Sequence, residues 1–131
     1  MEPAIVVACI AAALAAAVHA WIFVLETLRW EHPATRRVFG TSAEQAAQSK
    51  QLAANQGVYN LLLGIAALAG IVVLVAGARD AGLAVVLTAT GIMLGAAAYL
   101  GASGPRLRRA ALVQGVLPAV AVIAAAVALA G

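Results

Sequence analysis

Apolar residues fill four long runs of the chain, and short polar segments separate these runs. The runs cover about residues 3–30, 52–78, 81–103 and 110–131. A helix needs about 20 apolar residues to cross the hydrocarbon core of a membrane, and each run is long enough. A membrane-spanning β-strand would need only about 10 residues of alternating polarity, a pattern that none of the runs shows. The sequence therefore predicts four membrane-spanning helices.

The polar segments between the runs indicate how the helices are connected. Residues 79–80 leave room only for a short turn, and residues 104–109 form a second short connection that contains glycine and proline. The first connection, residues 31–50, is longer. Within it, Ser42 precedes Gln45 by three residues, which is the pattern of a capping box at a helix N-terminus. We therefore expect a helix to begin after Ser42 and to continue into the second span.

Composition excludes most other classes of protein. The chain has 131 residues, of which 65% are hydrophobic and 10% are charged. A soluble domain has about 45–50% apolar and about 25% charged residues, so this chain has too few charges to cover a soluble surface. A single cysteine excludes a disulfide-rich scaffold. We interpret residues 1–131 as one all-α transmembrane domain, a polytopic bundle of four helices.

The basic residues predict the orientation of this bundle. Four spans place the first and third connections on one side of the membrane, and that side carries seven of the eight basic residues: Arg29, Arg36, Arg37, Lys50, Arg106, Arg108 and Arg109. The other side holds both termini and only Arg79. Because basic loops stay in the cytoplasm, we expect both termini on the non-cytoplasmic side of the plasma (inner) membrane. The net charge of +3 reflects this topology, and we expect no binding to nucleic acid.

Small residues indicate where the helices approach one another. Gly91 and Gly95 form a G-x-x-x-G pattern in the third span, and Ala66 and Gly70 repeat the spacing in the second. Such residues let helix backbones pack closely in lipid. Gly57 lies inside a polar block, where we expect a close contact between the first two spans. We expect Gly57→Leu to disrupt folding more than Gly82→Leu, because we place residue 82 in the exposed turn.

A few strongly polar residues interrupt the apolar spans. Such side chains are costly in lipid unless they are paired or face a cavity, so they are informative. His19 and Glu26 are seven residues apart, which places them on one helix face about 10 Å apart along the axis. All of the polar groups fall in the predicted cytoplasmic half. We therefore predict a polar cluster, with a cavity open to the cytoplasm, formed by the following ligand-binding candidates: His19, Glu26, Trp30, Asn55, Gln56, Tyr59, Asn60 and Gln114.

The same residues also permit a purely structural interpretation. Glu26 could pair with Arg29 or with the basic residues 106–109, and His19 could hydrogen-bond Asn60 or Gln114 to lock the bundle. No metal site is predicted, because His19 and Glu26 are too far apart to chelate one ion on a straight helix. No nucleophile–base pair, phosphate loop or carboxylate dyad is visible, so the sequence predicts no hydrolase and no cofactor.

The order of these motifs resembles a known family of small four-span membrane proteins, domain-of-unknown-function family 1304. The resemblance covers nearly the whole chain, and its most specific element is the block Asn-Gln-Gly-x-Tyr-Asn at residues 55–60. The sequence departs from the family pattern at Arg29, where the family is more often apolar. The resemblance implies the four-span architecture and supplies no reaction, substrate or cofactor. Its motifs read His19-x-x-x-Phe23-x-x-Glu26-x-x-x-Trp30, then Phe39, the block at 55–60, and Gln114-Gly115-x-x-Pro118-Ala119.

The sequence leaves three functions open. The leading hypothesis is a small membrane protein that binds or transports a small molecule or ion, with Glu26 as its charged centre and membrane lipids as its surroundings. Four short helices rarely enclose a wide path alone, which favours a homo-oligomer. The second is a membrane enzyme that acts on a lipid or quinone-like substrate, with His19 or Glu26 as acid or base. The third is a structural or accessory subunit, in which the polar layer only fixes the helix register.

Overall fold

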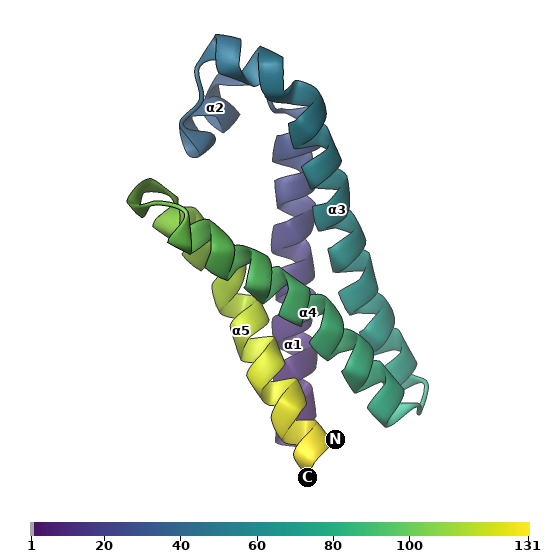
Figure 1. The fold of residues 1–131 in the computed structure, drawn as a ribbon. Helices are drawn as coiled ribbons and strands as arrows, with labels where there is room; N and C mark the ends of the chain where they lie inside the picture. Colours follow the sequence, from purple (N-terminus) through teal and green to yellow (C-terminus); the bar gives the residue numbers. More distant parts are fainter. Residues whose placement is uncertain (1) are drawn as a thin grey trace.

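The computed structural model describes residues 2–131, which form helices joined by short connections (Figure 1). Four segments within this range are long and apolar enough to cross a membrane, and the range contains no strand. The all-α, four-span architecture is therefore confirmed. In chain order the elements are α1 (Pro3–Phe23), the π-helical turn η1 (Val24–Leu28), α2 (Pro33–Phe39), α3 (Ala43–Val75), α4 (Arg79–Ala102), the 3₁₀ turn η2 (Pro105–Leu107) and α5 (Arg108–Ala130).

Helix α3 begins at the predicted capping box and is the longest element of the fold. The backbone amide of Gln45 donates to Ser42 Oγ at 3.1 Å, and the backbone amide of Ser42 donates to Gln45 Oε1 at 2.9 Å. The prediction that a helix begins there is therefore confirmed. Its 33 residues extend about 50 Å, well beyond a hydrocarbon core of about 30 Å. The polar first turns of α3, before the apolar run that starts at residue 52, therefore extend out of the membrane.

The four long helices form two hairpins that pack together at one end. Helix α1 packs against α3 and α5, and α4 packs against α3 and α5. Both termini lie at the same end of the bundle, whereas α2 and the α4–α5 connection lie towards the other end, where the α4–α5 hairpin diverges from α1 and α3 (Figure 1). The best-packed core lies nearer the termini and consists mainly of alanine, with larger residues at Ile5, Leu74, Leu83 and Val86.

Close helix contacts near the termini depend on two glycines. A methyl group added at Gly70 would lie 2.8 Å from the Val86 amide nitrogen, and one added at Gly82 would lie 2.6 Å from Leu74 Cα. Gly82 is therefore buried against α3, and the expectation that it tolerates a large side chain in an exposed turn is wrong. The reason is that α4 begins at Arg79, so Gly82 already lies in its first turn and faces back onto α3.

The G-x-x-x-G pattern of the third span has a different environment. Methyl groups added at Gly91 or Gly95 would meet no atom within 4 Å. These glycines therefore make no close helix contact within the chain, whereas the pair Ala66 and Gly70 lies at helix interfaces. The two patterns have the same spacing, but only the one in α3 contributes to the fold of the single chain.

Candidate ligand-binding site

Glu26 lies in the π-helical turn η1, which ends the first span. The turn includes a hydrogen bond of 3.0 Å from the Arg29 amide to the Val24 carbonyl, five residues earlier. A π-helical turn contains one residue more than an α-helical turn would and occurs frequently at functional sites. Its presence breaks the regular spacing from which Glu26 and His19 were expected to share one face.

The carboxylate of Glu26 is held by an amide from α3. Asn60 Nδ2 donates to Glu26 Oε2 at 3.0 Å and to the Gln56 carbonyl at 3.1 Å, and Glu26 and Asn60 are both half-buried. The ion pairs found among residues 2–131 involve other carboxylates. Pairing of Glu26 with Arg29 or with residues 106–109 is therefore not observed. The structure places a carboxylate inside a span with a neutral donor as its partner.

The turn η1 lies close to the backbone of α3 at Gly57, which brings Asn60 within reach of Glu26. A methyl group there would overlap Thr27 Oγ1 and would lie 3.1 Å from Glu26 Cβ. The hydroxyl of Thr27 donates to the Ala54 carbonyl at 3.2 Å, which fastens η1 to α3. Gly57 thus lets η1 lie directly on α3, and Asn60, three residues later, reaches Glu26. The sequence pattern did not single out Thr27. Two features of the sequence could have indicated its contact with α3: it directly follows Glu26, and the polar block of the next span contains a glycine.

His19 is fully packed but stays within its own helix. Its side chain is 2% exposed, and its Nδ1 shares a hydrogen bond of 2.9 Å with the Ala15 carbonyl, one turn earlier. The hydrogen bond to Asn60 or Gln114 that a structural role predicts is not formed. The structure therefore does not connect His19 to Glu26 through hydrogen bonds.

Trp30 links the first connection to the N-terminal turns of α3 through hydrogen bonds. Its indole Nε1 donates to the Ala46 carbonyl at 3.1 Å and to Ser49 Oγ at 3.2 Å. Its ring packs against Phe39 with the two centroids 5.0 Å apart. The tryptophan is thus held by residues of α2 and the first turns of α3, on the side of η1 that leads out of the membrane.

The remaining candidates from the polar block are exposed and form no side-chain hydrogen bond to Glu26. Asn55, Gln56 and Tyr59 are exposed, with Tyr59 at 58%. Asn55 lines an open groove of about 650 Å³ with Thr27, beside the amide side chains of residues 48 and 51. Gln114 is half-exposed on α5. At the end of the bundle that contains α2, α5 diverges from the first span (Figure 1). The side chains that meet directly are therefore Glu26 and Asn60, with Thr27 on the adjacent side of Gly57.

Metal binding through a cluster of protein ligands is not supported by this arrangement. In the part of the chain that the structure describes, no group of three His, Cys, Asp or Glu side chains comes close enough to hold an ion. The site offers one carboxylate, one amide and nearby hydroxyl and backbone groups. Such a set can accept hydrogen bonds and compensate a positive charge.

Most of the chain matches one known protein family. The family model described as "Protein of unknown function (DUF1304)" matches residues 13–126. The chain belongs to the DUF1304 family. The matched range contains Glu26, Thr27, Gly57 and Asn60, so the whole contact between η1 and α3 lies within the family region. The resemblance drawn from the sequence motifs is confirmed. No curated protein and no solved structure matches this DUF1304 member.

Proposed function

We propose that this DUF1304 member is a membrane protein that binds a small cation, or the ammonium group of a small molecule, at Glu26. The observation that supports the proposal is the half-buried carboxylate within the first span, which has an amide donor and no basic partner among residues 2–131. An ionisable side chain inside a membrane is costly, and it usually marks an ion, proton or ligand site. A bound cation would compensate this charge.

The contacts of Glu26 leave one of its two carboxylate oxygens without a hydrogen-bond partner in residues 2–131. Asn60 occupies Oε2, whereas Oε1 accepts no hydrogen bond from the described part of the chain. Asn60 is fixed in turn by its second bond to the Gln56 carbonyl. The amide therefore orients the carboxylate, and one oxygen is left for a positively charged or hydrogen-bonding group.

The geometry supports binding more than passage across the membrane or catalysis. Between this site and the termini, the core is mainly apolar, with side chains such as Ile5, Leu83 and Val86 at most 5% exposed. Two polar side chains buried there, His19 and Thr90, share hydrogen bonds with carbonyls of their own helices. A transported ion would need polar groups that are free to contact it there. An acid–base pair of Glu26 and His19 is not supported either, because the His19 ring shares its hydrogen bond with its own helix. Transport and enzymatic activity therefore receive less support than binding.

The proposal can be tested by thermal unfolding of the purified protein in detergent. The panel contains sodium, potassium, magnesium and methylammonium chloride at constant ionic strength. A ligand that binds only the folded state raises the melting temperature with concentration. We expect at least one of these cations to raise it for the wild type and to have no such effect on Glu26→Gln, which preserves shape and hydrogen bonding but carries no charge.

Glu31→Gln is the matched control for this experiment. Glu31 is exposed and pairs with Lys50 outside the spans, so the same change of charge there should leave the cation effect intact. Equal shifts in the wild type and Glu26→Gln would refute the proposal. Absence of a shift with every cation of the panel would refute it as well.

We also propose the orientation that the basic residues favour, with both termini on the non-cytoplasmic side of the plasma membrane. The end with α2 and η2 carries seven Lys and Arg residues, whereas the end with the termini carries Arg79 alone. Arg79 is moreover paired with Glu2 and Asp80 at 3.1 and 3.0 Å. Basic residues concentrate on the cytoplasmic side of membrane proteins, which supports this assignment.

The orientation predicts opposite labelling of two exposed alanines. In a Cys9→Ala background, which contains no other cysteine, Ala43→Cys should resist a membrane-impermeant maleimide in intact cells, and Ala81→Cys should react. Ala43 follows the capping residue, so the capping box stays intact. Both positions should react after the cells are lysed. Labelling of residue 43 and protection of residue 81 in intact cells would reverse the proposed orientation.

A further inference from the structure

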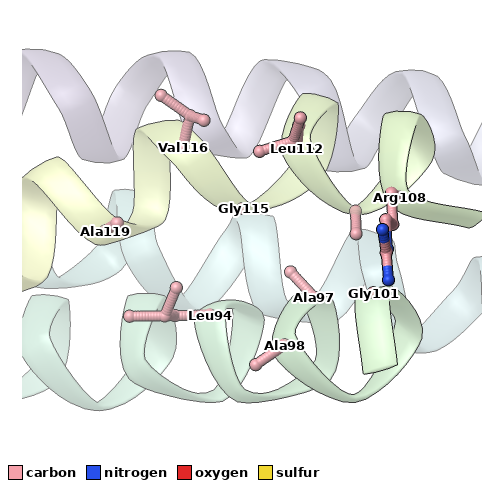
Figure 2. Close-up of a pocket in the computed structure, with 10 residues that line it drawn as sticks. Leu94, Ala97, Ala98, Gly101, Arg108, Leu112, Gly115, Val116 and Ala119 are labelled. Atoms are coloured by element: carbon pink, nitrogen blue, oxygen red, sulfur yellow. The ribbon is translucent and has the colours of Figure 1, made fainter. Parts of the chain in front are cut away.

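A second feature of the structure lies on the α4–α5 hairpin, away from Glu26. An open groove of about 430 Å³ runs between the two helices (Figure 2). Its floor is formed by small residues on both sides, including Ala97 and Gly101 of α4 and Gly115 and Ala119 of α5. A methyl group added at Gly115 would lie 2.8 Å from Ala97 Cβ, so the helices are already as close as these residues allow. The groove therefore results from small side chains on two closely packed helices.

The length of the groove matches one leaflet of a bilayer. On α5 its lining extends from Arg108 to Ala119, which is about 16 Å along the helix axis. Half of a hydrocarbon core is about 15 Å. Tyr99, which is 79% exposed on α4, lies close to the end that contains Arg108, and exposed tyrosines favour the headgroup level of a membrane. The groove is thus long enough to extend from the membrane surface to about its midplane.

Charge is confined to one end of this groove. Arg108 is its only charged lining residue, and its guanidinium lies at one end beside Gly101 (Figure 2). Arg106 and Arg109 are exposed next to it, and none of the three forms an ion pair among residues 2–131. The apolar groove is complementary to an acyl chain, and the unpaired guanidinium groups at its end are complementary to an anionic headgroup.

We propose that the α4–α5 groove binds an anionic phospholipid, with one acyl chain along the groove and the phosphate at Arg108. An arginine fork can donate two parallel hydrogen bonds to a phosphate, and the unpaired positive charge favours a headgroup with a net negative charge over one whose phosphate is balanced by a cation. A second copy of the chain fits less well. Copies in one membrane share an orientation, so a parallel copy in the groove would place its own arginine-rich end beside Arg108. This proposal is independent of the function proposed for Glu26.

The proposal predicts a headgroup preference that depends on Arg108. The probe is the purified protein in neutral detergent with added dioleoylphosphatidylglycerol or dioleoylphosphatidylcholine, and the readout is the lipid concentration that gives half of the maximal rise in melting temperature. We expect the wild type to prefer phosphatidylglycerol. Arg108→Gln should weaken phosphatidylglycerol binding roughly five- to tenfold and phosphatidylcholine binding less, so that the preference is lost.

Two matched controls separate the groove from the general surface. Arg37→Gln removes the same charge from an exposed position on α2, outside the groove, and should keep the preference. Ala98→Leu places a large side chain into the groove and should weaken the binding of both lipids, whereas Ala96→Leu on an exposed part of the same helix should not. Melting temperatures without lipid verify that each variant is folded.

Several results would overturn the proposal. Equal responses of the wild type to the two lipids would exclude a headgroup site, and an equal loss in Arg37→Gln and Arg108→Gln would indicate general surface charge. Glycerol 3-phosphate, which has the phosphate but no acyl chain, should give no shift at the same concentrations. If it stabilises the protein as much as phosphatidylglycerol does, the acyl chain in the groove is refuted.

Discussion

A Gly82→Ala substitution should destabilise the protein more than the same change at Gly57 or at Gly91. The added methyl group would overlap the backbone of Leu74, with Cα only 2.6 Å away, and a backbone cannot rotate aside. Overpacking of this kind costs about 1–3 kcal/mol or more. At Gly57 the overlapping atom is the Thr27 hydroxyl, a side chain that can turn away at the cost of its hydrogen bond to Ala54. Gly57→Ala should therefore be destabilising, but less so.

Gly91→Ala provides the matched control in the middle of α4. It meets no atom within 4 Å, and the change from glycine to alanine favours a helix by about 0.5–1 kcal/mol. The expected order of melting temperatures is Gly91→Ala at or above the wild type, then Gly57→Ala, then Gly82→Ala. Thermal unfolding of the three purified variants in one detergent measures this order. A Gly82→Ala protein as stable as the wild type would contradict the packing of α4 on α3.

The second large effect is expected at Asn60. Replacement by leucine keeps a similar volume but removes the only hydrogen bond that the Glu26 side chain makes in residues 2–131. A half-buried carboxylate without its donor costs about 1–3 kcal/mol, so Asn60→Leu should lower the free energy of unfolding by that amount. Glu26→Gln should be nearly neutral, because Asn60 Nδ2 can donate to the amide oxygen as well.

Combination of the two changes tests whether the loss of stability in Asn60→Leu comes from a carboxylate without its donor. In the double variant Glu26→Gln, Asn60→Leu, the carboxylate is absent, and most of the loss caused by Asn60→Leu should be recovered. Asn55→Leu is the control, because residue 55 is exposed on the same helix and gains the same apolar area. If Glu26→Gln alone unfolds earlier yet retains the cation effect, Glu26 is a structural partner and does not bind the ligand.

The features with strong local signals were the ones that the sequence could predict. The four spans follow from apolar length, and the start of α3 follows from the pair Ser42 and Gln45, whose side chains bond backbone groups three residues away. Neither feature depends on contacts with distant parts of the chain. The family resemblance follows from motifs of the same local kind, above all the block at residues 55–60, and the family-model match over residues 13–126 confirms it.

The direction in which each polar side chain points could not be predicted. Depth in the membrane follows from position in the sequence, but the rotation of α3 about its axis is set by its contacts with η1 at Gly57 and Thr27. That rotation turns Asn60 towards Glu26 and leaves Asn55 exposed. The π-helical turn adds one residue to the last turn of the first span, so side-chain directions beyond it do not follow the spacing of an α-helix. The burial of Gly82 was missed for a similar reason, since the short turn places α4 against α3 from its first turn.

The length of α3 has a consequence for hydrophobic mismatch. Its polar N-terminal turns are anchored at the aqueous side by the capping box and by Trp30, and moving them into lipid would expose amide and charged groups to hydrocarbon. The end of the bundle that contains Glu26 therefore keeps its depth, with Gly57 about 9 Å along α3 from Gln51. We expect a thicker or thinner bilayer to be accommodated at the opposite end, where Arg79 and the termini lie. The distance of the carboxylate from water is then expected to depend little on the thickness of the membrane.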